Sequence, residues 1–114
     1  MPRFSKSHAL LSDAAVGSLA SLGRRLREAR LRRNWTQALA AEKAGLSESS
    51  IKKVEAGSVH TTIAAYLSLL DIYGLPTALD QIIAPGTDTL GEALSRAQQR
   101  RRASQPRNHD EWEI

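Results

Sequence analysis

The segment GLSESSIKKVEAG, from Gly45 to Gly57, constrains the fold more than any other part of the sequence. Ser47 is suited to cap the start of a helix, and Gly57 is suited to end it. Leu46 and Ile51 occupy the N′ and N4 positions of a hydrophobic staple, which fixes how the chain enters the helix. Most of the remaining residues are polar. The segment therefore predicts a short helix with a narrow core face and a polar outer face that is free to contact another molecule.

A second short helix is expected just before this one, in WTQALAAEKAG. Thr36 is a suitable N-cap, and Gly45 a suitable left-handed residue at the end. Ala40 and Ala44 are predicted to face the core, and Ala41 is small where another helix would cross closely. Two short helices held at a steep angle by a glycine-containing turn of about three residues form a helix-turn-helix.

Helical spacing recurs in the rest of the chain, whereas the strict alternation of a strand does not. Ser12 can cap a first helix in DAAVGSLASLGRRLREARLRRN, although Gly17 and Gly23 favour a start near Ser18. Further helices are predicted in TTIAAYLSLLDIYG and LPTALDQIIAP, with a marginal helix in TDTLGEALSRAQQRRRAS. The apolar residues expected to face the core are Val16, Leu19, Leu22, Leu26 and Ala29 in the first helix, Ile63, Tyr66, Leu67, Leu70 and Tyr73 in the fourth, and Leu79, Ile82 and Ile83 in the fifth.

Composition excludes several classes of protein. The chain has 114 residues and no cysteine, so it has no disulfide, thiolate nucleophile or zinc–thiolate site. His8, His60 and His109 are scattered, and no paired-histidine motif or glycine-rich phosphate loop is present. No apolar run approaches the ~20 residues that span a bilayer. We expect a cytoplasmic protein that is not an enzyme and has no cofactor or metal.

Positive charge is concentrated in the first half of the sequence. Residues 1–60 hold eleven Lys or Arg and five Asp or Glu, a net charge of +6, and residues 61–114 hold five and seven, a net charge of −2. This asymmetry indicates a surface that meets a polyanion, although a solvated surface would show the same excess.

The segments LGRRLREARLRRNWTQ, AEKAGLSESSIKKVEAG and YLSLLDIYGL together resemble the Xre/Cro-repressor family of DNA-binding domains. The resemblance covers roughly residues 19–83. It implies an all-α fold, a five-helix lambda-repressor-like helix-turn-helix domain, and double-stranded DNA as the partner. We assign residues 1–17 to an N-terminal flank, 18–84 to the DNA-binding domain, 85–104 to a C-terminal helical extension and 105–114 to a flexible, disordered tail.

The resemblance also implies roles for individual residues. The base-reading positions of the family correspond to Glu48, Ser49 and Lys53, with Lys52 close enough to reach either base or phosphate. Gln37 and Ser47 correspond to phosphate contacts, and Arg32 and Arg33 are further phosphate candidates because they lie near the second helix. Arg30 and Glu55 correspond to a buried structural pair. Glu48 has two interpretations, because an acidic residue here can repel wrong DNA sites or compensate the helix dipole.

One position departs from the family pattern. The second helix has Ala40 where the family has a large leucine, and Leu39 comes one residue earlier. Either Trp35 or Tyr66 fills the space, or the helix is rotated slightly.

The flanking segments narrow the resemblance. ARLRRNWTQ and TLGEALSRAQQRRR look like the corresponding parts of HipB-like antitoxins, which partner HipA-like serine/threonine kinase toxins. This likeness implies a homodimer that represses its own promoter and neutralises a kinase. Trp112 and Ile114 are candidate partner contacts, with an ordinary flexible tail as the alternative. Two other classes stay open: a stand-alone phage or chromosomal repressor, and a protein-interaction domain that has lost DNA binding.

Overall fold

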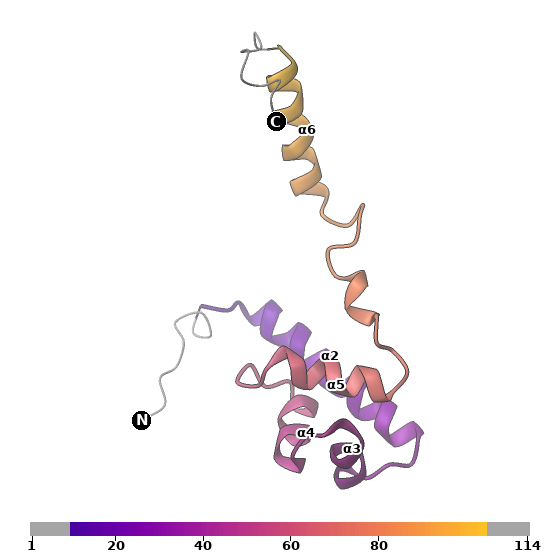
Figure 1. Ribbon diagram of the computed structural model, residues 1–114. Coiled ribbons are helices and arrows are strands. Elements are labelled where there is room, and N and C mark those ends of the chain that lie inside the picture. Colours follow the sequence, from indigo (N-terminus) through magenta and orange to yellow (C-terminus); the bar gives the residue numbers. More distant parts are fainter. Residues whose placement is uncertain (1–9, 105–114) are drawn as a thin grey trace. The chain divides into compact units, whose positions relative to one another are not determined.

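The computed structural model describes residues 10–104, and this part of the chain is helical without any strand (Figure 1). The predicted all-α fold is therefore confirmed, and so is the extra C-terminal helix. The predicted tail contacts Trp112 and Ile114 lie outside the described residues. The elements are α2 (Asp13–Arg32), α3 (Gln37–Ala44), α4 (Glu48–Glu55), α5 (Ile63–Ile72), the 3-10 helix η1 (Ala78–Gln81) and α6 (Thr89–Ser104). The described residues form two compact units, which divide between Ala78 and Leu79.

Side-chain caps set the starts of the four helices in the first unit. Each cap residue has extended backbone, and its hydroxyl accepts a hydrogen bond from the backbone N–H three residues later. The pairs are Ser12–Ala15 (3.1 Å), Thr36–Leu39 (3.0 Å), Ser47–Ser50 (3.1 Å) and Thr62–Ala65 (3.3 Å). Such caps typically contribute about 1 kcal/mol each to stability. The cap on α2 also decides where the first helix begins, which is Asp13 and not Ser18.

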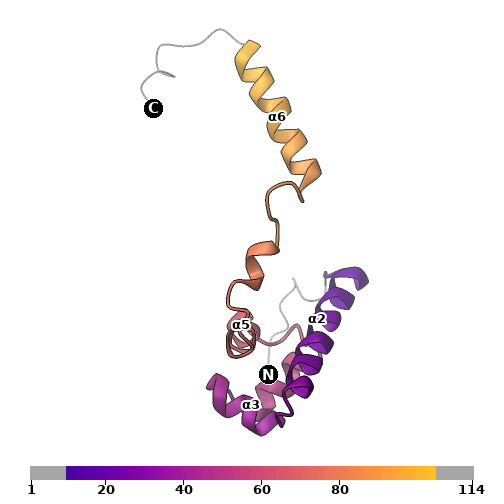
Figure 2. The ribbon, with the colours of Figure 1, turned by 90° about the vertical axis from the view of Figure 1, so that its right-hand side faces the viewer.

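Helix α4 packs against each of the other three helices of the first unit, α2, α3 and α5. Ile51 and Val54 of α4 and Leu69 of α5 are the largest completely buried side chains. The other buried apolar residues are Leu26, Ala29, Ala40, Ala41, Ala65, Tyr66, Leu70 and Tyr73. Figure 2 shows α2 and α3 meeting at one end of α2, where the turn between them lies. The narrow apolar face predicted for α4 is therefore the middle of the core.

Backbone contact between α2 and the end of α4 depends on two glycines. A Cβ on Gly23 would lie 2.6 Å from the carbonyl oxygen of Val54 and 2.7 Å from that of Glu55. A Cβ on Gly57 would lie 2.5 Å from the Cα of Ala20, and Gly57 also has φ +71°. Neither approach leaves room for a side chain. The absence of a Cβ at these positions thus allows the backbones of α2 and α4 to touch.

Two parts of the predicted core were wrong. In α5, Ile63 and Leu67 are exposed, whereas Leu69, which the prediction left out, is completely buried. Tyr66, Leu70 and Tyr73 are buried as predicted, so the buried face of α5 is only shifted from the predicted stripe, toward Leu69. In α2, Val16 is exposed.

The second unit has no buried residue in its described helices. The predicted fifth helix is the four-residue 3-10 helix η1, and Ile82 and Ile83, expected in the core, are 64% and 76% exposed. Leu79 is only half-buried. Ile83 has φ +55°, which is incompatible with a continuing α-helix and ends the helical run. Helix α6 follows, and its Leu90 and Leu94 are exposed as well. None of the helices in residues 10–104 is long and apolar enough to cross a membrane.

Candidate nucleic-acid interface

The outer side of α4 brings together the four residues predicted to contact DNA bases. Glu48, Ser49, Lys52 and Lys53 are all exposed. At about 100° of rotation per residue, they fall on one continuous side of the helix. Ile51 and Val54 occupy the opposite side and are completely buried. The helix is thereby fixed by its apolar side while it presents a polar and charged ridge to solvent.

The N-terminus of α4 is occupied by its cap. The Ser47 hydroxyl oxygen accepts from the Ser50 backbone N–H at 3.1 Å and lies 2.9 Å from the Ser50 hydroxyl. Glu48 stands in the first turn, where a carboxylate is favoured by the positive end of the helix dipole. Ser47 is exposed, so the predicted phosphate contact at this position is compatible with its capping role.

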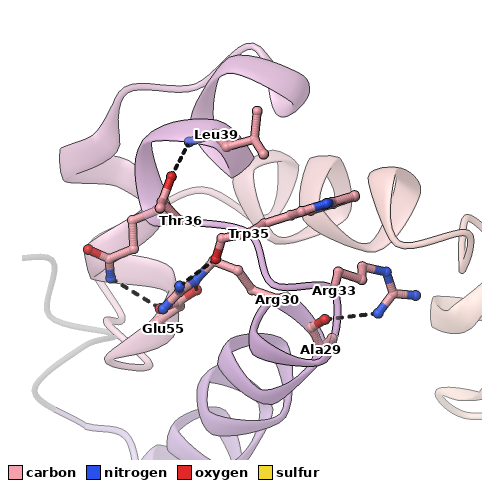
Figure 3. A network of polar contacts seen from close by, with 8 residues as sticks. Ala29, Arg30, Arg33, Trp35, Thr36, Leu39 and Glu55 are labelled. Atoms are coloured by element: carbon pink, nitrogen blue, oxygen red, sulfur yellow. Dashed lines mark hydrogen bonds and ion pairs between the residues drawn. The ribbon is translucent and has the colours of Figure 1, made fainter.

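A buried ion pair ties α4 to α2. The Arg30 guanidinium donates from Nε to Glu55 Oε2 at 2.7 Å and from Nη2 to Glu55 Oε1 at 2.9 Å (Figure 3). Both side chains are more than nine-tenths buried. The pKa of Arg30 is raised, chiefly by its hydrogen bonds with Glu55. The predicted structural pair is present with two-point geometry, which fixes orientation as well as distance.

The same carboxylate also holds the start of α3. Gln37 is the first residue of α3, and its Nε2 donates to Glu55 Oε1 at 3.1 Å. Arg30 Nη1 donates to the backbone carbonyl of Trp35 at 3.0 Å. One arginine and one glutamate therefore connect α2, the turn before α3, α3 itself and α4. Gln37 is half-buried, and its amide has a second N–H in addition to the one given to Glu55.

The two arginines predicted to contact phosphate differ in their surroundings. Arg32 is exposed in the last turn of α2. Arg33 donates from Nη1 to the carbonyl oxygen of Ala29 at 2.9 Å and from Nη2 to that of Tyr73 at 3.0 Å. Its guanidinium thus joins the ends of α2 and α5. These bonds favour a structural role for Arg33, while Arg32 stays available for a phosphate.

An aromatic group that the sequence did not predict lies beside these residues. The rings of Trp35 and Tyr73 stack with centroids 5.8 Å apart. The Arg33 guanidinium lies 5.0 Å from the Tyr73 ring centre, and Lys43 Nζ lies 4.7 Å from that of Trp35. In the sequence, only the presence of cationic residues near Trp35 indicates these contacts. The spacing of the residues does not show that Tyr73 stacks on Trp35.

The structure also shows which residue of the second helix faces the core. Ala40 is completely buried, whereas Leu39 is 37% exposed. The helix is therefore not rotated to bring Leu39 inward. Tyr66 is buried, and its hydroxyl donates to the carbonyl of Ser58 at 3.0 Å.

Comparison with known proteins agrees with this geometry. The family model of the helix-turn-helix domain matches residues 21–81, which is more than half of the chain. The chain therefore belongs to the helix-turn-helix domain family, and membership of this class supports a DNA-binding regulator with an Xre-like fold. A search of curated proteins found no match.

Proposed function

We propose that the protein is a sequence-specific DNA-binding transcriptional repressor that acts as a homodimer in the cytoplasm. The observation that carries this proposal is the arrangement of α4, whose buried Ile51 and Val54 leave Glu48, Ser49, Lys52 and Lys53 on the exposed side. A helix of this kind can enter the major groove, which admits an α-helix. The role of the helix is binding and not catalysis.

The chemistry of the exposed residues suits reading of base edges. A lysine can donate to the O6 and N7 acceptors of guanine, a glutamate can accept from the N4 amino group of cytosine, and a serine can pair with several bases. Gln37 begins α3, Ser47 caps α4 and Arg32 lies in the last turn of α2, and these three residues are proposed to contact phosphate. Phosphate contacts set the position of the protein on the duplex, whereas base contacts specify the sequence.

Selection of binding sites from a randomised duplex pool tests this function. The wild-type chain is expected to enrich one sequence, and Lys53→Ala is expected to relax the preference at one base position, with a cost of ~1–3 kcal/mol at the best site. Lys43→Ala is the matched control, because it removes the same charge from α3, where Lys43 lies over Trp35. A wild-type chain that enriches no sequence, even at low salt, would contradict the proposal and favour an interaction domain.

We further propose that this repressor is the antitoxin of a HipA/HipB-type system and binds a HipA-like kinase toxin. Two features support this finer proposal: the resemblance of its flanking segments to HipB-like antitoxins, and the exposed Leu90 and Leu94 of α6, which suit a protein partner. A toxin bound across the repressor dimer would strengthen operator binding by thermodynamic linkage.

Copurification at native expression level distinguishes the antitoxin from the stand-alone repressor. A bound kinase whose activity falls as the chain is titrated in would support the antitoxin. Recovery of the chain without a kinase, together with operator binding, would favour the phage or chromosomal repressor.

A further inference from the structure

Helix α6 carries four arginines that have no partner in residues 10–104. Arg96, Arg100, Arg101 and Arg102 are exposed and make no hydrogen bond or ion pair through their side chains there. The one acidic residue of α6 is Glu92, whose Oε1 accepts a hydrogen bond from the Gly86 backbone N–H at 2.8 Å. The helix therefore has four positive charges and one negative charge, with the positive charges from its middle to its last turn.

Stabilisation of the helix itself explains only part of this charge. Arg101 and Arg102 lie in the last turn, where a cation interacts favourably with the negative end of the helix dipole. Arg96 and Arg100 precede the last turn, and the favourable interaction with the helix dipole is confined to that turn. Around the helix, Arg100 lies about 40° and Arg101 about 140° from Arg96, so these three share one side of α6, whereas Arg102 points away from that side. The charges of Arg96 and Arg100 thus remain unexplained by the stability of the helix.

The chemistry of this surface points to phosphate. Between Arg96 and Arg102 the other residues are one alanine and two glutamines, so this half of the helix offers no large apolar side chain for a protein groove. The exposed leucines lie in the other half. Guanidinium groups bind phosphate oxygens through paired hydrogen bonds without reading base sequence. A DNA duplex already held by α4 would also present its backbone at a high local concentration.

We propose that Arg96, Arg100 and Arg101 of α6 form a second DNA-binding surface, which contacts the phosphates of the same duplex without sequence preference. This inference rests on the proposed function of α4. The α6 surface raises affinity for operator and random DNA alike, and it makes binding more salt-dependent because each phosphate contact releases counterions.

The salt dependence of binding by the full chain tests this surface. In the quadruple variant R96Q/R100Q/R101Q/R102Q, the slope of log K against log salt is expected to become less steep by about 3 per chain, since the three phosphate contacts of Arg96, Arg100 and Arg101 contribute about 0.9 each. The loss should be equal on the selected operator and on random duplex. Glutamine and arginine have similar helix propensities, so α6 is retained, which circular dichroism can verify.

The matched control replaces the same four arginines with lysine. This variant keeps every charge and is expected to keep the wild-type slope. If the glutamine variant keeps operator selection and the wild-type slope, the proposed function of α4 stands and the α6 surface is refuted. Equal loss of slope in the lysine and glutamine variants would also refute it, because charge would not be the cause. A wild-type chain that binds no duplex at low salt would refute both proposals.

Discussion

At the scale of single residues, Glu55 has the most demanding position. Its carboxylate accepts from Arg30 twice and from Gln37 once, in a buried site. Burying a charge is costly unless hydrogen bonds and an opposite charge compensate it. The geometry here provides both. Glu55 follows Val54 at the end of α4, so the ion pair also fixes the direction in which the exposed side of α4 points.

The first residue-scale prediction concerns this carboxylate. Glu55→Gln leaves the buried Arg30 charge uncompensated, and the free energy of unfolding is expected to fall by ~3–5 kcal/mol. Urea denaturation measures the effect. Glu28→Gln serves as the control, because Glu28 is exposed on α2 and should change stability by no more than about 0.5 kcal/mol. Equal effects of the two substitutions would mean that the pair adds nothing to the fold.

The second prediction separates the neighbours Arg32 and Arg33. Arg33→Ala removes the bonds to Ala29 and Tyr73, so it should lower stability by about 1 kcal/mol and leave the salt slope of DNA binding unchanged. Arg32→Ala should have little effect on stability and reduce the slope by about 0.9, the value of one phosphate contact. The reverse result would restore Arg33 as the phosphate contact that its sequence position suggests.

At the scale of elements, the orientation of α4 depends on how closely α2 approaches it. The carbonyl oxygens of Val54 and Glu55 lie 2.6 and 2.7 Å from the position that a Cβ of Gly23 would take. Because those atoms belong to the backbone, they cannot move aside as a flexible side chain can. A larger residue at Gly23 must therefore shift one helix against the other and disturb the ion pair of Arg30 with Glu55.

Gly23→Ala and Gly17→Ala form a matched test within α2. Alanine favours a helix by about 1 kcal/mol relative to glycine. A Cβ on Gly17 would meet no other atom within 4 Å, so Gly17→Ala should raise stability by up to that amount. Gly23→Ala should instead lower stability by ~1–3 kcal/mol, as for an overpacked core. Thermal unfolding compares the two. A stabilised Gly23→Ala variant would show that α2 and α4 separate without cost.

The elements also show what the sequence could and could not predict. Local chemistry predicted the caps Ser47 and Thr36 and the left-handed Gly45, because each depends on residues close in sequence. The buried side of α5 was mispredicted because its apolar residues go nearly around the helix, so periodicity does not distinguish Leu67 from Leu69. In the second unit, apolar residues such as Ile82 were predicted to be buried because burial of apolar side chains is favourable. The sequence does not show which other residues would cover them.

The sequence predicted the candidate DNA-binding site about as well as it predicted the helices. The shared exposed side of Glu48, Ser49, Lys52 and Lys53 follows from helical geometry once the buried residues are known. The contacts of Arg33 do not follow in this way, because its partner Tyr73 lies 40 residues later in the chain. Long-range hydrogen bonds of this kind require the tertiary fold, which spacing along the sequence does not contain.

At the scale of the whole molecule, a single α4 provides too little contact for a long operator. One recognition helix reads only a few base pairs, and proteins of this class commonly bind as dimers to two half-sites one helical turn apart. The proposed homodimer would place two α4 helices about 34 Å apart on one side of the duplex. The selected operator is then expected to show dyad symmetry.

Altering the spacing between half-sites tests this assembly. Insertion of about 5 base pairs rotates one half-site by half a turn, so a dimer that holds both α4 helices rigidly can contact only one of them. Affinity should fall to that of a duplex with a single half-site, and electrophoretic mobility shift with a concentration series measures it. A duplex with the same base pairs added outside the half-sites controls for length and composition. Undiminished affinity for the expanded site, or a selected site without dyad symmetry, would instead indicate that each chain binds DNA alone. The phosphate contacts proposed for α6 would then have to supply the affinity that a second subunit does not provide.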